Sequence, residues 1–387
     1  MQKKLKEKLV ITGILLLLSA AWLLGSRYHA TAYQVMAEEF LHSSPYHASR
    51  VNDIKWELTD SLGRNAGFAY LSKGSGYSGD IILLTLTDND FRITHNRVLD
   101  HSETYSYYQK LHQQNFFENL KGKHAAISRQ ANSVDIISGA TVSCMAIIQA
   151  IEASYLKAEG QKRQGLQMVA PGWKEALLLL LFINGIVLLK TSKPRLKKRI
   201  LWLSQFTSVV FLGFWLNSYL TLTQINALMQ GHLPLSSGGL FLAILLGGSI
   251  LIPLFTGKNL YCQTVCPFGS AQRIIGLLGH PRAFRPSWHH KLKYLQWALT
   301  LVALSMALAF RNPAISDYTI FDNFFRIGGP SFLVAVTIIT LLVSLVVSRP
   351  WCHFLCPLDG IFRWLKLIHL NLQLVWKSTP KPKRRIS

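Results

Sequence analysis

The stretch Asp135-Ile136-Ile137-Ser138-Gly139-Ala140-Thr141 decides how the first half of the chain is interpreted. It closes a polar segment and opens a run whose apolar residues recur at helical spacing from Cys144 to Tyr155. We therefore expect a helix that begins near Thr141, preceded by a small turn that contains glycine. The free N–H groups and the positive dipole end of such a helix favour a phosphate group. An ordinary capped helix, with Ser138 or Thr141 as the cap, satisfies the same pattern.

The same residues resemble the flavinylation motif of the FMN-binding domain family. That family includes flavoprotein subunits of the Rnf and Na+-pumping NADH:quinone reductase complexes and the NosR/NirI-like membrane proteins. Its members receive FMN on the last threonine of the motif through a phosphoester bond, installed by a flavin transferase outside the cytoplasm. The resemblance implies that Thr141 carries FMN and that Asp135, Ser138, Gly139 and Ala140 form the recognised turn.

A second pair of stretches supports this resemblance. Gly76-Tyr77-Ser78-Gly79 leads into an alternating apolar run, and His101-Ser102-Glu103-Thr104 follows it. Both are similar to signatures of the same family, which implies that His101, Glu103 and Thr104 belong to the cofactor site. The family often continues with Pro-Gly, where this chain has Tyr105-Ser106.

Composition indicates a membrane protein. The chain has 387 residues, 50% hydrophobic content and a formal net charge of +22, with a mean hydropathy of +0.23. Its basic residues flank apolar runs instead of lining a polar face with interleaved aromatics, so the charge favours membrane topology over nucleic-acid binding. Five cysteines in a chain of this length are not a disulfide framework.

The chain is expected to consist of three parts. Residues 1–32 contain a positive start and an apolar run, which fits an uncleaved anchor or a signal peptide. Residues 33–168 form an α+β extracytoplasmic FMN-binding domain. Its strands are predicted at Ile81–Leu86 and Phe91–Leu99, and its helices at Tyr33–Leu41 and Ser143–Ala158. Residues 169–387 form an all-α membrane domain with a basic cytoplasmic tail.

Apolar runs predict about six transmembrane helices in total. After the N-terminal run, the expected spans are Trp173–Leu189, Ile200–Leu222, Leu240–Phe255, Tyr294–Phe310 and Phe332–Val347. In this count the basic loops fall on one side of the membrane and the FMN-binding domain on the other. The chain is therefore expected to be a multi-pass protein of the bacterial inner membrane, with both termini in the cytoplasm. The amphipathic stretch Leu365–Trp376 is expected along the inner membrane surface.

The membrane domain contains an internal repeat. The pattern aromatic-Cys-x-x-x-Cys-Pro occurs at Tyr261–Pro267 and at Trp351–Pro357, each after a predicted span. Cysteines at i and i+4 share a helical face. Together Cys262, Cys266, Cys352 and Cys356 offer four thiolates, a ligand set for zinc, for a single iron or for an iron–sulfur cluster. Disulfides are a further alternative, although the topology puts these residues on the inner side. His353 is a candidate extra ligand.

The NosR/NirI-like proteins carry twin Cys-x-x-x-Cys-Pro motifs behind an FMN-binding domain, which favours iron at these cysteines. Many also carry a C-terminal pair of ferredoxin-type clusters, and the sequence to Ser387 has none. The inner electron donor is therefore expected to be a separate protein of the ferredoxin or flavodoxin type, or quinol.

Together these features predict an electron-transfer flavoprotein, a component of an oxidoreductase system. Electrons would pass from a cytoplasmic metal centre to covalent FMN and then to an extracytoplasmic reductase or metalloprotein. The alternative from a different class is a membrane redox sensor or an assembly factor for an extracytoplasmic metalloenzyme. No nucleic-acid partner is expected.

Overall fold

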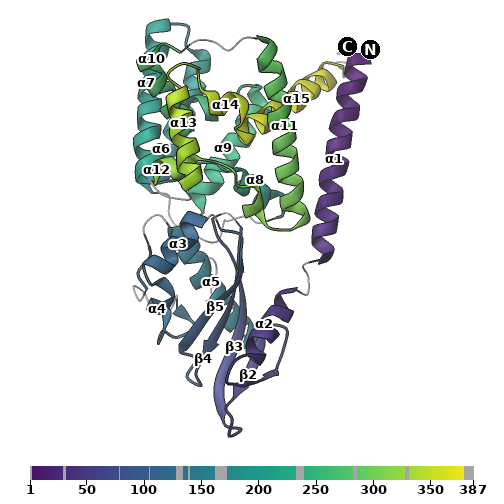
Figure 1. The fold of residues 1–387 in the computed structure, drawn as a ribbon, viewed down its shortest axis with the longest axis vertical. Helices are drawn as coiled ribbons and strands as arrows, with labels where there is room; N and C mark the ends of the chain where they lie inside the picture. The colour runs from purple at the N-terminus through teal and green to yellow at the C-terminus, as the bar shows by residue number, and fades with distance from the viewer. Residues whose placement is uncertain are drawn as a thin grey trace, which may run out of the picture. The chain divides into compact units, whose positions relative to one another are not determined.

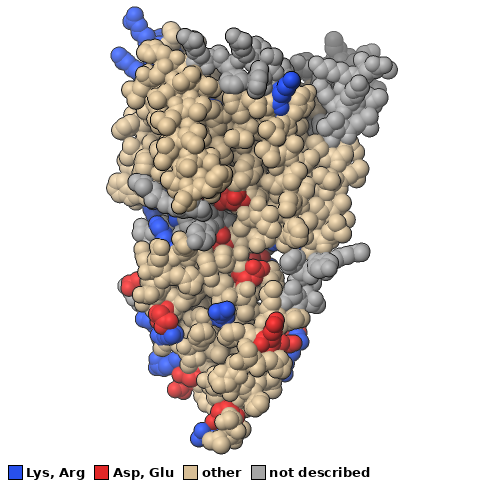
Figure 2. Space-filling model, in the orientation of Figure 1, with Lys and Arg blue, Asp and Glu red and all other residues tan. Residues whose placement is uncertain are grey.

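The computed structural model describes residues 2–28, 32–77, 79–103, 105–127, 134–137, 140–161, 172–231, 239–281, 286–326 and 331–378. The chain divides into two compact units (Figure 1). Unit 1 comprises Met1–Ala170, Thr221–Ala243 and Leu301–Tyr318, and unit 2 comprises Pro171–Leu220, Ile244–Thr300 and Thr319–Ser387. Charged side chains are common over the sheet of unit 1 and scarce over the helices of unit 2 (Figure 2).

Unit 1 is built on a five-stranded antiparallel sheet in which the strands follow chain order. The strands are β1 (His47–Arg50), β2 (Lys55–Thr59), β3 (Asn65–Ser75), β4 (Asp80–Thr87) and β5 (Ile93–His101). Short turns join all neighbours, so strands that are adjacent in sequence are adjacent in the sheet. The two predicted strands are confirmed as β4 and β5, which pair with each other, with Leu84 opposite Arg97.

Helices cover both faces of this sheet. Helix α2 (Ala32–His42) packs Leu41 into a core with Trp56 and Leu84. Helix α5 (Thr141–Ala158) covers the other face, where the rings of Tyr155 and Tyr70 meet edge to face at 5.9 Å. Because both faces are covered, every residue of β4 is buried. Both predicted helices are confirmed, and the remaining helices of this region are α1 (Gln2–Tyr28), α3 (Tyr105–Gln113) and α4 (Phe116–Leu120).

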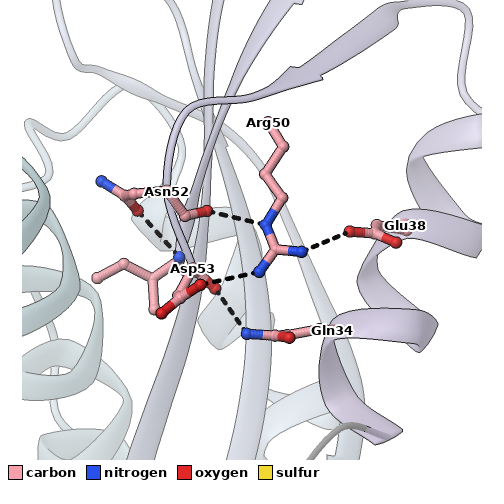
Figure 3. Close-up of polar contacts among 6 residues, drawn as sticks. Gln34, Glu38, Arg50, Asn52 and Asp53 are labelled. Carbon is pink, nitrogen blue, oxygen red and sulfur yellow. Dashed lines mark hydrogen bonds and ion pairs between the residues drawn. The ribbon is translucent and has the colours of Figure 1, made fainter.

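A polar network ties α2 to the first strands (Figure 3). The Arg50 guanidinium lies 2.9 Å from Asp53 Oδ1 and 3.5 Å from Glu38 Oε1. Gln34 Nε2 donates to the Asp53 carbonyl at 3.3 Å. Exposed ion pairs of this kind each contribute less than about 1 kcal/mol, so the network orients α2 while the apolar core supplies most of the stability.

Two segments from the second half of the chain complete unit 1. They are α8 (Leu222–Met229) and the 3-10 turn η5 (Pro313–Ser316), which pack against each other. A Cβ added at Gly79 would lie 3.1 Å from Pro313 Cγ, so η5 also contacts the turn between β3 and β4. Gly79 therefore leaves room for η5 beside the FMN-domain signature.

Unit 2 is helical. Its elements include α6 (Trp173–Lys190), α7 (Pro194–Thr207), η2 (Ser208–Trp215), η4 (Tyr261–Val265), α10 (Pro267–Gly279), α12 (Phe321–Phe325), α13 (Ser331–Val343), α14 (Pro350–Phe354) and α15 (Pro357–Ser378). Helices α9 (Leu240–Thr256) and α11 (Pro286–Ala309) contribute residues to both units.

The span expected at Ile200–Leu222 differs from the structure. The α-helix gives way to the π-helix η2 at Ser208 and ends at Trp215. Ser208 Oγ donates to the Val265 carbonyl at 2.5 Å, and Gly213 lies against the ring of Phe325. These contacts hold the wider helical turn, which sequence periodicity does not indicate.

Among the described residues, one helical stretch, Lys291–Ala309, is long and apolar enough to cross a membrane. Shorter apolar helices occur at Thr12–Gly25, Leu240–Thr256 and Ser331–Val343. The six-span topology and the three domain boundaries stay predictions.

Candidate functional site

Thr141 is the first residue of α5, as the sequence predicts. Its side chain is exposed, and Thr141 Oγ1 lies 3.4 Å from the Ile137 carbonyl oxygen. Ala140 is buried and precedes the helix, whereas Asp135 is exposed. Ser138, Gly139 and Thr104 lie outside the described residues. The threonine hydroxyl is thus accessible at a helix N-terminus, where unpaired N–H groups favour an anion.

The structure brings the two FMN-domain signatures together. Glu103 is 2% exposed, and its Oε1 accepts a hydrogen bond from the Tyr77 N–H at 2.7 Å. A Cβ at Gly76 would lie 1.7 Å from that same oxygen. A side chain at residue 76 would therefore force the Glu103 carboxylate out of the space that it occupies.

Glu103 lies near the first turn of α5, whereas His101 contacts α3. Burial raises the pKa of Cys144 to about 11, and the nearby Glu103 carboxylate adds to this shift. Cys144 is fully buried one turn after Thr141 and serves as a small core residue. His101 ends β5 and stacks on Tyr108 with ring centroids 3.6 Å apart. Burial lowers the pKa of His101.

The four repeated cysteines lie at helix boundaries in unit 2. Cys262 belongs to η4, and Cys266 is the N-cap of α10, whose first residue is Pro267. In the second copy Cys352 belongs to α14, and Cys356 directly precedes α15. The second cysteine of each pair thus lies outside the helix of the first, so the expected shared helical face is wrong, and each proline begins a new helix after its cysteine.

Backbone N–H groups approach the second cysteine of each pair. The N–H of Gly269 donates to Cys266 Sγ at 3.4 Å. The N–H of Asp359 makes the corresponding hydrogen bond to Cys356, which favours its thiolate. A sulfur at a helix N-terminus also gains from the helix dipole. The duplicated motif thus builds the same thiolate-stabilising arrangement twice.

The two pairs converge although about ninety residues separate them. A Cβ at Gly269 would lie 3.5 Å from Cys352 Sγ and 3.6 Å from Cys266 Sγ, so this glycine keeps the space between the pairs open. All five cysteines of the chain are free, and Cys266 and Cys356 are each 4% exposed. The disulfide alternative is therefore wrong for this structure.

The described side chains do not form the compact set that a single ion requires. A tetrahedral zinc with Zn–S bonds of about 2.3 Å requires sulfurs about 3.8 Å apart. Within the described ranges, no group of three His, Cys, Asp or Glu side chains is arranged to hold one ion, and this count includes His353. A cluster spreads its ligands over several irons and so accepts a wider set of thiolates.

Burial and mutual repulsion keep these thiols protonated unless a cation is bound among them. Burial raises the pKa of Cys352 to about 12, and the neighbouring Cys266 adds to the effect. Burial and the other three cysteines also raise the pKa of Cys262. Four adjacent thiolates are stable only when a positive centre lies among them, since bound metal reverses the local pKa shifts.

Three residues of this site were missed by sequence reasoning. Gln272 Nε2 donates to Cys352 Sγ at 3.5 Å, and Gln296 Nε2 donates to the Cys356 carbonyl at 2.5 Å. The positive charge of Arg349 lowers the pKa of Cys266 and Cys352, although burial dominates both. For the two glutamines, the signal in the sequence was a polar residue within an otherwise apolar helical run, which does not identify its partner.

Comparisons with known proteins agree with both sites. The model of the FMN-binding domain matches residues 76–155, which contain Thr141 and both signatures. The model of the 4Fe-4S binding domain matches residues 238–285 and 329–374, so each match contains one cysteine pair. No solved structure matches the chain.

Several curated proteins are similar to parts of the chain. The regulatory protein NosR of Pseudomonas aeruginosa is 27% identical over 49% of this chain and 30% of its own length. Protein NirI of Paracoccus denitrificans is 26% identical over 48% of this chain and 31% of its own length. YccM of Escherichia coli, named as a candidate electron transport protein, is 29% identical over 37% of this chain and 43% of its own length.

The chain thus spans less than half the length of these relatives. The two domain matches and the named relatives together support a NosR/NirI-like protein with an FMN-binding domain and a 4Fe-4S binding domain.

Proposed function

We propose that this protein transfers electrons across a bacterial inner membrane, with an iron–sulfur cluster on its four repeated cysteines and covalent FMN on Thr141. The observation that carries the proposal is the convergence of two distant cysteine pairs around Gly269. The four cysteines form no disulfide with one another, and four thiols match the ligand set of a cluster. The name of YccM, which refers to electron transport, supports the same class of function.

At the FMN site the chain supplies an attachment point and a fixed frame. The exposed Thr141 hydroxyl is accessible to a flavin transferase, and the first turn of α5 offers its N–H groups to the phosphate. The Glu103–Tyr77 hydrogen bond and Gly76 hold the two signature loops against each other. Bound FMN supplies the ability to exchange one or two electrons.

At the cysteine site the chain supplies four sulfur ligands and controls their surroundings. The helix N-termini at Cys266 and Cys356 favour thiolates, and Arg349 adds positive charge. The low exposure of both second cysteines limits access of water and oxidants. A 4Fe-4S cluster supplies one-electron chemistry when it is bound there.

The membrane placement rests on apolar surface as well as on charge. Leu180 and Ile183 of α6 are 51% and 56% exposed, and Phe332 and Ile339 of α13 are 75% and 58% exposed. Figure 2 shows few charges over these helices. Exposed apolar surface of this extent suits lipid contact. In the proposed topology the cysteines and both termini face the cytoplasm and the FMN-binding domain faces outward.

The donor would be a cytoplasmic ferredoxin, flavodoxin or membrane quinol, and the acceptor an extracytoplasmic reductase or metalloprotein. A second candidate function is a redox sensor or an assembly factor for such an acceptor. The name of NosR, a regulatory protein, favours that candidate. The two functions differ in flux, because a sensor needs no sustained electron transfer.

The test uses the full chain in sealed proteoliposomes of known orientation. A membrane-impermeant reductant on the cysteine side should reduce the FMN repeatedly while an oxidant outside reoxidises it. Cys352→Ser should abolish this flux and leave direct chemical reduction of FMN from the outside intact. Flux only from the flavin side would refute electron transfer across the membrane, and a single turnover without sustained flux would favour the sensor.

A further inference from the structure

Three buried glutamines surround the two cysteine motifs of unit 2. The exposed fractions are 2% for Gln205, 1% for Gln272 and 0% for Gln296. Burying an amide is unfavourable unless its polar atoms find partners. Their contacts therefore indicate what each glutamine does for the site.

Gln205 and Gln296 occupy corresponding places in the internal repeat. Gln205 lies on α7 and its Nε2 donates to the carbonyl of Gln263, inside the first motif, at 3.4 Å. Gln296 lies on α11 and its Nε2 donates to the Cys356 carbonyl at 2.5 Å. Each lies on a helix that comes before the apolar helix preceding its motif, with short helical elements in between: η2 and α8 in the first copy, η5 and α12 in the second. Both glutamines thus hold the backbone of a motif through carbonyl groups, which for Gln296 include the Cys352 carbonyl at 3.5 Å.

Gln272 departs from this repeat. It lies on α10, after the first cysteine pair, yet its side chain bonds to two residues of the second motif. Its Nε2 donates to Cys352 Sγ at 3.5 Å, and its Oε1 accepts from the Trp351 N–H at 3.3 Å. The corresponding residue of the second copy is Phe362, whose ring packs against Tyr261 at 5.9 Å. The second copy therefore has no side-chain amide at this position that could bond to the first motif.

The asymmetry has a chemical consequence. An N–H that donates to a ligand sulfur stabilises negative charge there, and reduction of a cluster adds negative charge. Such a donor favours the reduced state and raises the reduction potential. An acceptor contact to the Trp351 N–H has no such effect and only fixes geometry. The Oε1 of Gln272 thus positions the second motif, whereas its Nε2 acts on the reduction potential.

We propose that Gln272 is a positioning residue that joins the two cysteine motifs and raises the reduction potential of the cluster through its hydrogen bond to Cys352. This inference rests on the proposed function, since it requires the cysteines to hold a cluster. It adds the identification of one side chain, outside the cysteine motifs, that sets the driving force for electron transfer.

The experiment compares three variants of the full chain, purified anaerobically in detergent. Gln272→Met keeps the side-chain volume and removes both hydrogen bonds. Gln272→Glu keeps an acceptor for the Trp351 N–H and removes the donor to sulfur. Gln205→Met is the matched control, because it removes a buried amide of the same site that contacts a backbone carbonyl. The readouts are the iron content and the midpoint potential of the cluster. Absorbance and electron paramagnetic resonance monitor the redox titration.

Both Gln272 variants should lower the midpoint potential, with the reduction equilibrium about tenfold less favourable, which is about 59 mV for a one-electron couple. Gln205→Met should leave the potential of its loaded fraction unchanged, even where it lowers iron content. The potential is measured on cluster-bearing protein, so partial loss of iron does not affect the comparison.

Several results would overturn the inference. Potentials equal to wild type in both Gln272 variants would show that the amide does not tune the cluster. An equal shift in the Gln205 control would mean a general structural effect, and so would complete loss of iron in both Gln272 variants. Wild-type protein without iron would instead refute the proposed function itself.

Discussion

Replacing Gly76 by alanine tests the contact between the two FMN-domain signatures. The new Cβ would lie 1.7 Å from Glu103 Oε1 and 2.9 Å from its carboxyl carbon, both far inside van der Waals contact. The carboxylate must therefore leave its place and give up the 2.7 Å hydrogen bond from the Tyr77 N–H. Loss of a hydrogen bond to a charged group costs about 2 kcal/mol, and overpacking adds about 1 kcal/mol.

A total of about 3 kcal/mol corresponds to roughly a hundredfold change in the local opening equilibrium. Hydrogen exchange of the Tyr77 amide in the full chain measures this directly, because its protection reports local opening. We expect exchange about a hundredfold faster in Gly76→Ala. Gly63→Ala is the control: it lies in the same sheet domain at φ 72°, and its Cβ would meet nothing within 4 Å.

Gly63→Ala introduces backbone strain of about 1 kcal/mol away from Glu103 and should leave Tyr77 exchange nearly unchanged. Wild-type protection of Tyr77 in Gly76→Ala would refute the reasoning, because Glu103 could not then occupy the space beside Gly76. Equal acceleration in both variants would mean that any strain in the sheet loosens this turn.

Four further predictions follow from the same structure. Thr141→Val should lose the flavin fluorescence that survives denaturing electrophoresis, and retention of that signal would place the attachment elsewhere. Cys262→Ser and Cys352→Ser should each lose iron by metal analysis, whereas Cys144→Ser, which alters a buried thiol of the other unit, should keep it. Burial lowers the pKa of His101, so the unfolded state binds a proton more readily. Stability should therefore fall as pH drops below about 6.5, and His101→Gln should flatten that part of a pH–melting curve. Lys55→Met should destabilise unit 1 by ~2 kcal/mol in denaturant titrations, since it removes the 2.5 Å partner of the largely buried Glu159.

Local features that follow a regular residue pattern could be predicted from the sequence. Alternation predicted the Ile81–Leu86 strand and its partner, and helical spacing predicted α5 with Thr141 at its start. The duplicated motif predicted that four cysteines act together. These features repeat within a few residues or within a recognisable unit, so periodicity and spacing reveal them.

Features that depend on contacts between distant residues could not be predicted from the sequence. The π-helix at Ser208 depends on a carbonyl at Val265, and the convergence of the two cysteine pairs depends on packing around Gly269. The roles of Gln272 and Gln296 likewise appear only when α10 and α11 meet the second motif. A glutamine in an apolar run predicts a buried partner without saying which one.

The central claim is that one chain carries both redox centres. Iron, acid-labile sulfide and covalent FMN measured in the same anaerobic preparation of the full chain test it most directly. The account predicts four irons and four sulfides per chain, as in a 4Fe-4S cluster, together with one FMN that Thr141→Val removes without loss of iron. Stoichiometric zinc without sulfide, or FMN that denaturation releases, would contradict it.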